Sequence, residues 1–163
     1  MGMFRGIRNL LWEIFDAQRL LVLPREERRV VVYGEDRSTW SQMQGYLEIL
    51  MEAHGRDVLY VSSDSDDPLF MTHHPRMEMF YVNRGFSSII PKLDSDICIF
   101  TMPDLGQLHV RRPKPASCAL YLFHSLNSIH CMYRKGAFDN YDAFFCAGPH
   151  HRTRLAETTG RAQ

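Results

Sequence analysis

Apolar runs alternate with polar, turn-forming or helically spaced segments over most of the chain after residue 29. Short runs of this kind predict strands that are buried on both faces, which is typical of a parallel sheet covered by helices. The runs that we expect to form strands are residues 30–33, 58–61, 77–82, 97–101, 118–123 and 143–146.

Helical patterns separate several of these runs. Ser38 or Thr39 can cap a helix that continues to about His54, and Gly55 can end it. A short helix is expected over residues 86–93, and a new helix begins near residue 150. The alternation predicts an α/β fold, a Rossmann-like doubly wound domain over residues 29–163 with a mostly parallel sheet of about six strands.

An amphipathic helix is predicted at the N-terminus, over residues 3–23 of a segment that ends at Pro24. Its apolar stripe consists of Phe4, Ile7, Leu11, Ile14 and Phe15, with Leu21 extending it. The mixture of basic and aromatic residues fits a peripheral membrane anchor. The alternative is a helix that packs on its own domain or dimerises with a partner subunit. We favour packing because Glu13 and Asp16 dilute the basic face.

Composition limits which kinds of partner the protein can bind and in which cellular compartment we expect it. The formal net charge is zero, which argues against nucleic acid as a bulk electrostatic partner. No run is long enough for a transmembrane helix, and no signal peptide is apparent. Four cysteines lack C-x-x-C spacing, so we expect buried, reduced thiols and a cytoplasmic protein.

No cofactor or metal ion is expected from the motifs. Gly34 stands alone where a dinucleotide-binding fold carries G-x-G-x-x-G, and the chain has no P-loop motif. The pairs His73–His74 and His150–His151 lack the spacing that puts two imidazoles on one helical face. Ser38 and Thr39 could hold an anion or a substrate hydroxyl at a helix N-terminus, although simple capping is the alternative.

His124 is the strongest candidate for catalysis. It follows the apolar run 118–123, and reacting side chains are commonly displayed at the carboxyl end of a parallel strand. An imidazole titrates near neutral pH and can act as a general base. The alternative is that His124 caps the strand and binds the backbone. Candidate substrate-binding residues nearby, which could hold a phosphorylated ligand, are Ser125, Ser128, His130, Arg134 and Lys135.

The segment Y-L-F-H-S-L-N-S-I-H-C-M-Y-R-K-G-A-F-D-N-Y-D-A-F-F-C-A-G-P-H-H resembles the N-terminal domain of CDP-glycerol glycerophosphotransferases. These are bacterial enzymes of teichoic-acid and related polymer synthesis, and they look like GT-B glycosyltransferases. The positions that carry the resemblance are His124, residues 134–135, residues 138–142 and residues 148–149. It is clearest over residues 118–151.

The resemblance implies a GT-B enzyme with two Rossmann-like halves. The N-terminal half would bind a polyol-phosphate or glycan acceptor, and His124 would take the proton from its hydroxyl. The nucleotide donor would bind only through a missing C-terminal domain, so this chain would be inactive alone. It would lie in the cytoplasm, at the inner face of the membrane if its first helix is an anchor. The alternatives are a non-catalytic binding or oligomerisation module and an unrelated small α/β enzyme for a phosphorylated metabolite.

Overall fold

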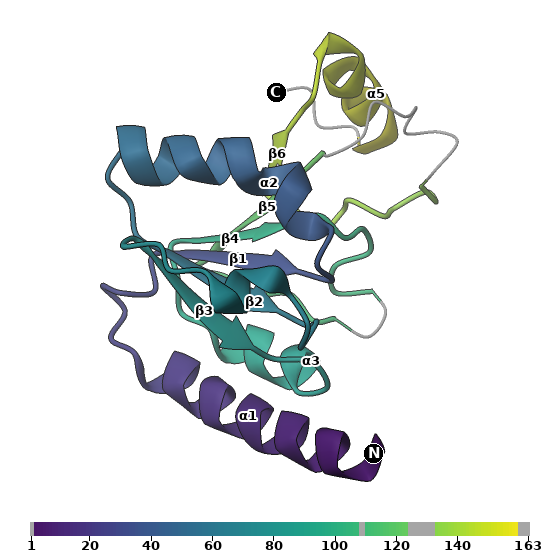
Figure 1. Cartoon of the computed structure of the whole chain (residues 1–163). Coiled ribbons are helices and arrows are strands. Elements are labelled where there is room, and N and C mark those ends of the chain that lie inside the picture. The colour runs from purple at the N-terminus through teal and green to yellow at the C-terminus, as the bar shows by residue number, and fades with distance from the viewer. Residues whose placement is uncertain (1, 108–109, 124–132, 160–163) are drawn as a thin grey trace.

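A six-stranded, all-parallel sheet with the order β3-β2-β1-β4-β5-β6 forms the centre of the computed structural model (Figure 1). The structure describes residues 2–107, 110–123 and 133–159. The predicted α/β, Rossmann-like fold is confirmed, and each predicted strand is present. The strands are β1 Val30–Gly34, β2 Val58–Ser62, β3 Met77–Tyr81, β4 Ile97–Phe100, β5 Cys118–Leu122 and β6 Ala143–Phe145.

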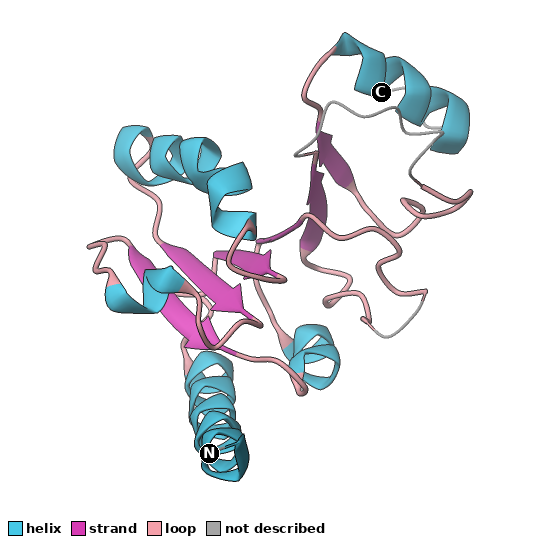
Figure 2. Ribbon diagram, turned by 45° about the vertical axis from the view of Figure 1, so that its right-hand side comes forward, coloured by secondary structure: helices cyan, strands magenta, loops and turns pink. Residues whose placement is uncertain are grey.

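Helices cover both faces of this sheet, and α1 and α5 lie at its opposite ends (Figures 1 and 2). Gly55 ends the second helix with a φ of 59°, in the left-handed region that glycine adopts without strain. The helices are α1 Gly2–Val22, α2 Thr39–Glu48 with a π-helical turn Ile49–Ala53, the 3-10 turn Pro68–Met71, α3 Phe86–Ile89 with a 3-10 turn Ile90–Lys92, and α5 Pro149–Thr159.

Two hydrophobic cores lie on the two faces of the sheet. Strand β1 supplies both, because Val30 and Val32 pack toward α2 while Val31 and Tyr33 pack toward α3. Side chains along a strand alternate between the faces, so a strand buried on both sides is apolar throughout. This is why residues 30–33 form an uninterrupted apolar run.

Gly34 ends β1 at a point where no larger residue fits. A Cβ atom there would lie 2.3 Å from the hydroxyl oxygen of Tyr60 and 2.9 Å from the Cζ atom of its ring. The glycine therefore serves a close approach by a neighbouring side chain. The Tyr60 hydroxyl is buried and has no hydrogen-bond partner among the described residues.

Helix α1 packs along the edge strand β3 with two acidic side chains in the contact. Glu13 and Asp16 are almost fully buried, with 6% and 2% of their surface exposed. Oδ2 of Asp16 accepts the backbone N–H of Tyr81 at 2.7 Å. Oε1 of Glu13 accepts the N–H groups of Asn83 and Gly85 at 3.0 and 2.6 Å. The two carboxylates thus satisfy backbone donors at an edge that would otherwise lie open.

Most of the predicted apolar stripe of α1 faces away from the domain, whereas Leu21 packs against the core. Phe4, Leu11 and Phe15 are 78%, 63% and 62% exposed. The helix therefore packs on its own domain, as one of the two interpretations had it, and Trp12 and Leu20 supply apolar contacts on the inner side in place of most of the predicted stripe. Further exposed apolar residues of α1 are Ile7, Leu10, Ile14 and Val22.

Candidate functional site

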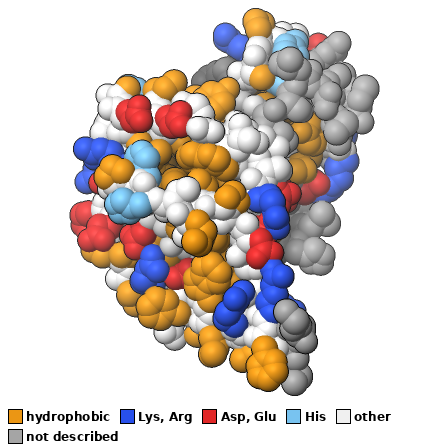
Figure 3. All heavy atoms as spheres, in the orientation of Figure 1, with side chains coloured by type: hydrophobic (Ala, Val, Ile, Leu, Met, Phe, Trp, Pro, Cys, Tyr) orange, Lys and Arg blue, Asp and Glu red, His pale blue; other side chains and the backbone are white. Residues whose placement is uncertain are grey.

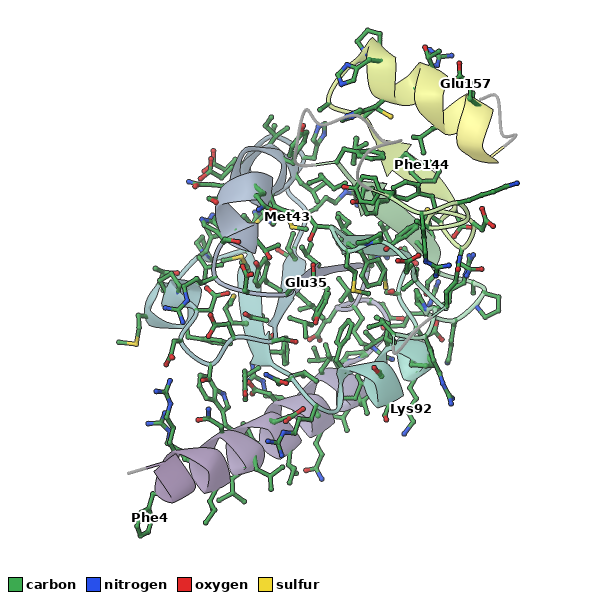
Figure 4. All side chains as sticks on the ribbon, turned by 90° about the vertical axis from the view of Figure 1, so that its right-hand side faces the viewer. Phe4, Glu35, Met43, Lys92, Phe144 and Glu157 are labelled. Atoms are coloured by element: carbon green, nitrogen blue, oxygen red, sulfur yellow. The ribbon has the colours of Figure 1, made fainter. Side chains whose placement is uncertain are left out.

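The carboxyl ends of β1 and β4 form the topological switch point of the sheet. The strands that follow β1 continue to one side of it, and those that follow β4 continue to the other. Ligands of open α/β sheets bind in the crevice at such a point. Glu35 comes directly after β1 and lies near the middle of this edge in Figure 4, while Asp104 lies in the loop after β4.

Glu35 is the titratable group that the sequence reasoning missed. Glu35 is exposed at the surface, but the protein around its carboxyl group partly shields that group from water. This burial raises the pKa of the carboxyl group, and the negative charge of Asp36 raises it further. Burial, and to a smaller degree the charge of Glu35, also raises the pKa values of Tyr121 and Tyr141. A carboxyl group with a raised pKa exchanges protons closer to neutral pH, so Glu35 is suited to general acid or base chemistry.

Asp104 and Arg134 join the loop after β4 to the segment before β6. Asp104 adopts a φ of 63°, which a non-glycine residue takes only where its surroundings hold it. Its backbone N–H donates to the carbonyl of Ala137 at 2.8 Å, and its carboxylate pairs with Nε of Arg134 at 2.7 Å. Nη2 of Arg134 donates to Oε1 of Gln107 at 2.7 Å. The guanidinium group is thus already paired, whereas Lys135 is exposed.

Aromatic side chains fix the end of β5. The rings of Tyr121 and Phe123 meet edge to face at 4.7 Å, and Phe138 and Tyr141 contact Tyr121 at 4.9 and 5.2 Å. The hydroxyl of Tyr141 donates to the carbonyl of Met102 at 2.5 Å. The cluster ties the end of β5 to the loop after β4.

The motif F-D-N-Y-D at residues 138–142 therefore has a structural role. Phe138 and Tyr141 lie in the aromatic core, and Oδ2 of Asp142 accepts the backbone N–H of Ala119 at 2.8 Å. The same oxygen pairs with Arg112 at 2.5 Å. The motif holds the chain against β5 just before β6 begins.

His124, Ser125, Ser128 and His130 lie outside the described residues. Phe123, the residue before His124, is buried at the end of β5, and its backbone N–H donates to the carbonyl of Phe145 at 3.0 Å. The catalytic role of His124 and the binding roles of the other three stay predictions. Of the expected site residues, the structure describes Arg134, Lys135, Ser38 and Thr39.

The hydroxyls of Ser38 and Thr39 are engaged by Asp36. Oδ1 of Asp36 accepts both the backbone N–H and the hydroxyl of Ser38, at 2.7 and 2.5 Å. These hydrogen bonds lower the pKa of Asp36. Oγ1 of Thr39 accepts the backbone N–H of Asp36 at 3.4 Å. Ser38 takes the N-cap position of α2, as one of the two residues predicted there, but its side chain makes no capping hydrogen bond because its hydroxyl donates to Asp36. Ligand binding by these two residues stays a prediction.

Two grooves lie away from the switch point. The larger groove has a volume of about 540 Å³ and lies between the first half of α1 and the end of β3. The smaller, of about 250 Å³, lies between α2 and strands β4 to β6, and its lining is mainly apolar. The larger is lined by Gly6, Ile7, Asn9, Leu10, Glu13, Tyr81, Asn83 and Arg84. The smaller is lined by Met43, Tyr46, Leu47, Ile49, Leu50, His54, Ile99, Leu122 and Phe145.

Cys98 is a buried free thiol, and burial raises its pKa to about 11. Cys118 and Cys146 are free and partly buried, and Cys131 lies outside the described residues. Within residues 2–107, 110–123 and 133–159, no three His, Cys, Asp or Glu side chains are grouped so as to share a metal ion. No helix of that same part is long and apolar enough to cross a membrane.

Comparisons with protein-family models, with curated proteins and with solved structures find no match for this chain. The class of this protein is given by its fold, which is that of a Rossmann-like α/β protein. Because this fold serves many chemistries, the function has to be argued from the site.

Proposed function

We propose that this chain is the acceptor-binding domain of a CDP-glycerol glycerophosphotransferase-like or glycosyltransferase-like protein of cell-surface polymer synthesis. The observation that carries the proposal is the carboxyl edge of the sheet, where Glu35, with its raised pKa, follows β1 and the segment of resemblance leaves β5. Strand β4 alone separates these two strands. Titratable groups that follow these two strands fit the activation of a hydroxyl group.

The proposed reaction is the transfer of glycerol phosphate to an acceptor hydroxyl. The hydroxyl oxygen forms a bond to the phosphorus that carries the glycerol, and the bond from that phosphorus to the leaving CMP breaks. His124 takes the proton of the hydroxyl. Glu35 would supply a second titratable group at the same edge, and Lys135 an exposed positive charge for the phosphates of the acceptor. The donor nucleotide would be held by a second domain.

Titration calorimetry tests this assignment. Wild type, His124→Ala and Glu35→Gln should be titrated separately with glycerol phosphate oligomers, CDP-glycerol and CDP, with the exposed His73→Ala as the matched control. Loss of a hydrogen bond to the acceptor in His124→Ala should weaken its binding about tenfold, while His73→Ala should bind as wild type does.

The nucleotide titrations decide between the alternatives. We expect no heat with CDP or CDP-glycerol, because the donor half is not part of the proposed site. Nucleotide binding that requires His124 would overturn the proposal and favour a small, self-sufficient enzyme. In Glu35→Gln, the dependence of acceptor binding on pH should lose a transition that lies above the usual range of a carboxyl group.

A further inference from the structure

The outer side of α1 is a broad apolar surface. Phe4, Leu11 and Phe15 project from it, and Figure 4 shows Phe4 pointing away from the body of the domain. At about 100° per residue, the exposed apolar positions span an arc of about 140° around the helix axis. We define the outer stripe as Phe4, Ile7, Leu10, Leu11, Ile14, Phe15 and Val22. Ile7 and Leu10 are about half exposed and also line the larger groove between α1 and the end of β3.

The charges of α1 are sorted between its two sides. The helix contains three arginines and two acidic residues, and both acidic residues, Glu13 and Asp16, are turned inward onto β3. Arg5 pairs with Asp66, and Arg19 pairs with Asp16 and Glu78, so Arg8 supplies the exposed positive charge of the helix. Asp16 pairs with Arg19 and so reduces the positive charge of the helix, as the sequence predicts, whereas Glu13 binds backbone N–H groups. Orange and blue side chains accordingly gather over α1 at the lower edge of Figure 3.

We propose that α1 docks the protein onto the surface of an anionic lipid bilayer, with the helix axis in the plane of the interface. A broad apolar arc bordered by arginine is the pattern of interfacial helices, whose basic residues contact anionic headgroups. Lys92, in the 3-10 turn after α3, points to the same lower side as Phe4 in Figure 4 and adds to the positive charge.

A second copy of the chain fits this surface less well. A helix–helix seam needs a narrow stripe at two positions per heptad, whereas the outer stripe is much broader. A helix of this length is about 30 Å long, so a stripe about 10 Å wide would bury about 600 Å² between two copies. Stable interfaces bury about 1,000 Å² or more.

Docking through α1 would orient the sheet. The first half of the helix lies beside the loops that follow β2 and β3, because Nδ2 of Asn9 donates to the hydroxyl of Ser65 at 2.9 Å and Glu13 binds Gly85. The sheet would therefore stand on its β3 edge, and the β3 end of its carboxyl edge would lie nearest the bilayer. The inference rests on α1 and Lys92 and does not require the proposed function.

Co-sedimentation with vesicles tests the docking surface. Wild-type protein should sediment with vesicles of equimolar phosphatidylcholine and phosphatidylglycerol, and less with phosphatidylcholine alone. The double variant Leu11→Gln/Phe15→Gln should lose about tenfold in partitioning, because it removes apolar side chains that enter the interface. Met71→Gln is the matched control, since Met71 is 91% exposed but lies outside α1.

Arg8→Gln separates the electrostatic part of the docking. It should weaken binding to the anionic vesicles severalfold and leave binding to phosphatidylcholine unchanged, and added salt should act in the same direction. Circular dichroism should show that each variant is folded. Two results would overturn the proposal: wild-type protein that stays in the supernatant with anionic vesicles, or a lipid-free dimer in sedimentation equilibrium that Leu11→Gln/Phe15→Gln dissociates.

Discussion

Helices α1 and α2 pack against the same sheet but differ in which side chains they bury. α2 buries apolar residues, with Met43 fully buried and Leu47 2% exposed, and turns polar residues outward. α1 buries Glu13 and Asp16 together with Leu20, and leaves the outer stripe exposed. The difference follows from what each helix covers. α2 covers the face of the sheet, which is apolar, whereas α1 covers the edge strand β3, where backbone N–H groups need acceptors.

The largest effect is expected from the apolar contact of α2. Leu47→Ala removes a buried side chain and leaves a cavity in the core on that face. The free energy of unfolding should fall by about 3 kcal/mol. Urea unfolding followed by circular dichroism measures it, and a loss similar to that of an exposed substitution such as Met71→Ala would contradict the packing described for α2.

Glu13→Ala breaks the polar contact of α1. The N–H groups of Asn83 and Gly85 lose their acceptor, so the free energy of unfolding should fall by about 2 kcal/mol. Glu13→Gln keeps an acceptor oxygen and should lose less. If Glu13→Ala unfolds at the same urea concentration as wild type, the carboxylate does not hold α1 to the edge.

Tyr60→Phe tests the one buried hydroxyl on the α2 side that has no hydrogen-bond partner among the described residues. Because the hydroxyl loses its water on folding without gaining a bond, its removal should raise the free energy of unfolding by about 1 kcal/mol. The same urea titration detects the gain. A loss of stability would indicate that the hydroxyl makes a bond in solution.

Asp16→Asn should change how the free energy of unfolding depends on pH more than it changes the magnitude of that free energy. Burial is the largest influence on Asp16 and raises its pKa, against the opposing effects of the Tyr81 N–H and Arg19. The protonated carboxyl is therefore favoured in the folded state. Relative to Asp16→Asn, the wild type should be most stable below about pH 4 and should lose stability as the pH rises through the raised pKa. Urea titrations at a series of pH values measure this difference, and a difference that grows with pH would contradict it.

Much of the fold could be predicted because buried strands such as residues 30–33 and 118–123 are uniformly apolar. The inward side of α1 could not be predicted in the same way. The spacing of Phe4, Leu11 and Phe15 is identical whether the stripe faces the domain or solvent. Only the position of the β3 edge shows why Glu13 and Asp16 are buried.

The candidate site could be predicted only in part. The sequence predicts a site at the end of β5. Glu35 becomes a candidate only through the strand order, because that order brings β1 beside β4. The left-handed conformation of Asp104 has no signature in its neighbours along the chain, and its pairing with Arg134 depends on the tertiary fold. The hydroxyls of Ser38 and Thr39 are engaged by Asp36, which lies two and three positions before them.

The contact between Gly34 and Tyr60 also constrains how this sequence can vary. A methyl group at position 34 would occupy the space of the phenol oxygen, so alanine there requires the ring at position 60 to move or to shrink. The two positions should consequently change together. Among related sequences, a larger residue at position 34 should occur only where position 60 holds a side chain shorter than tyrosine.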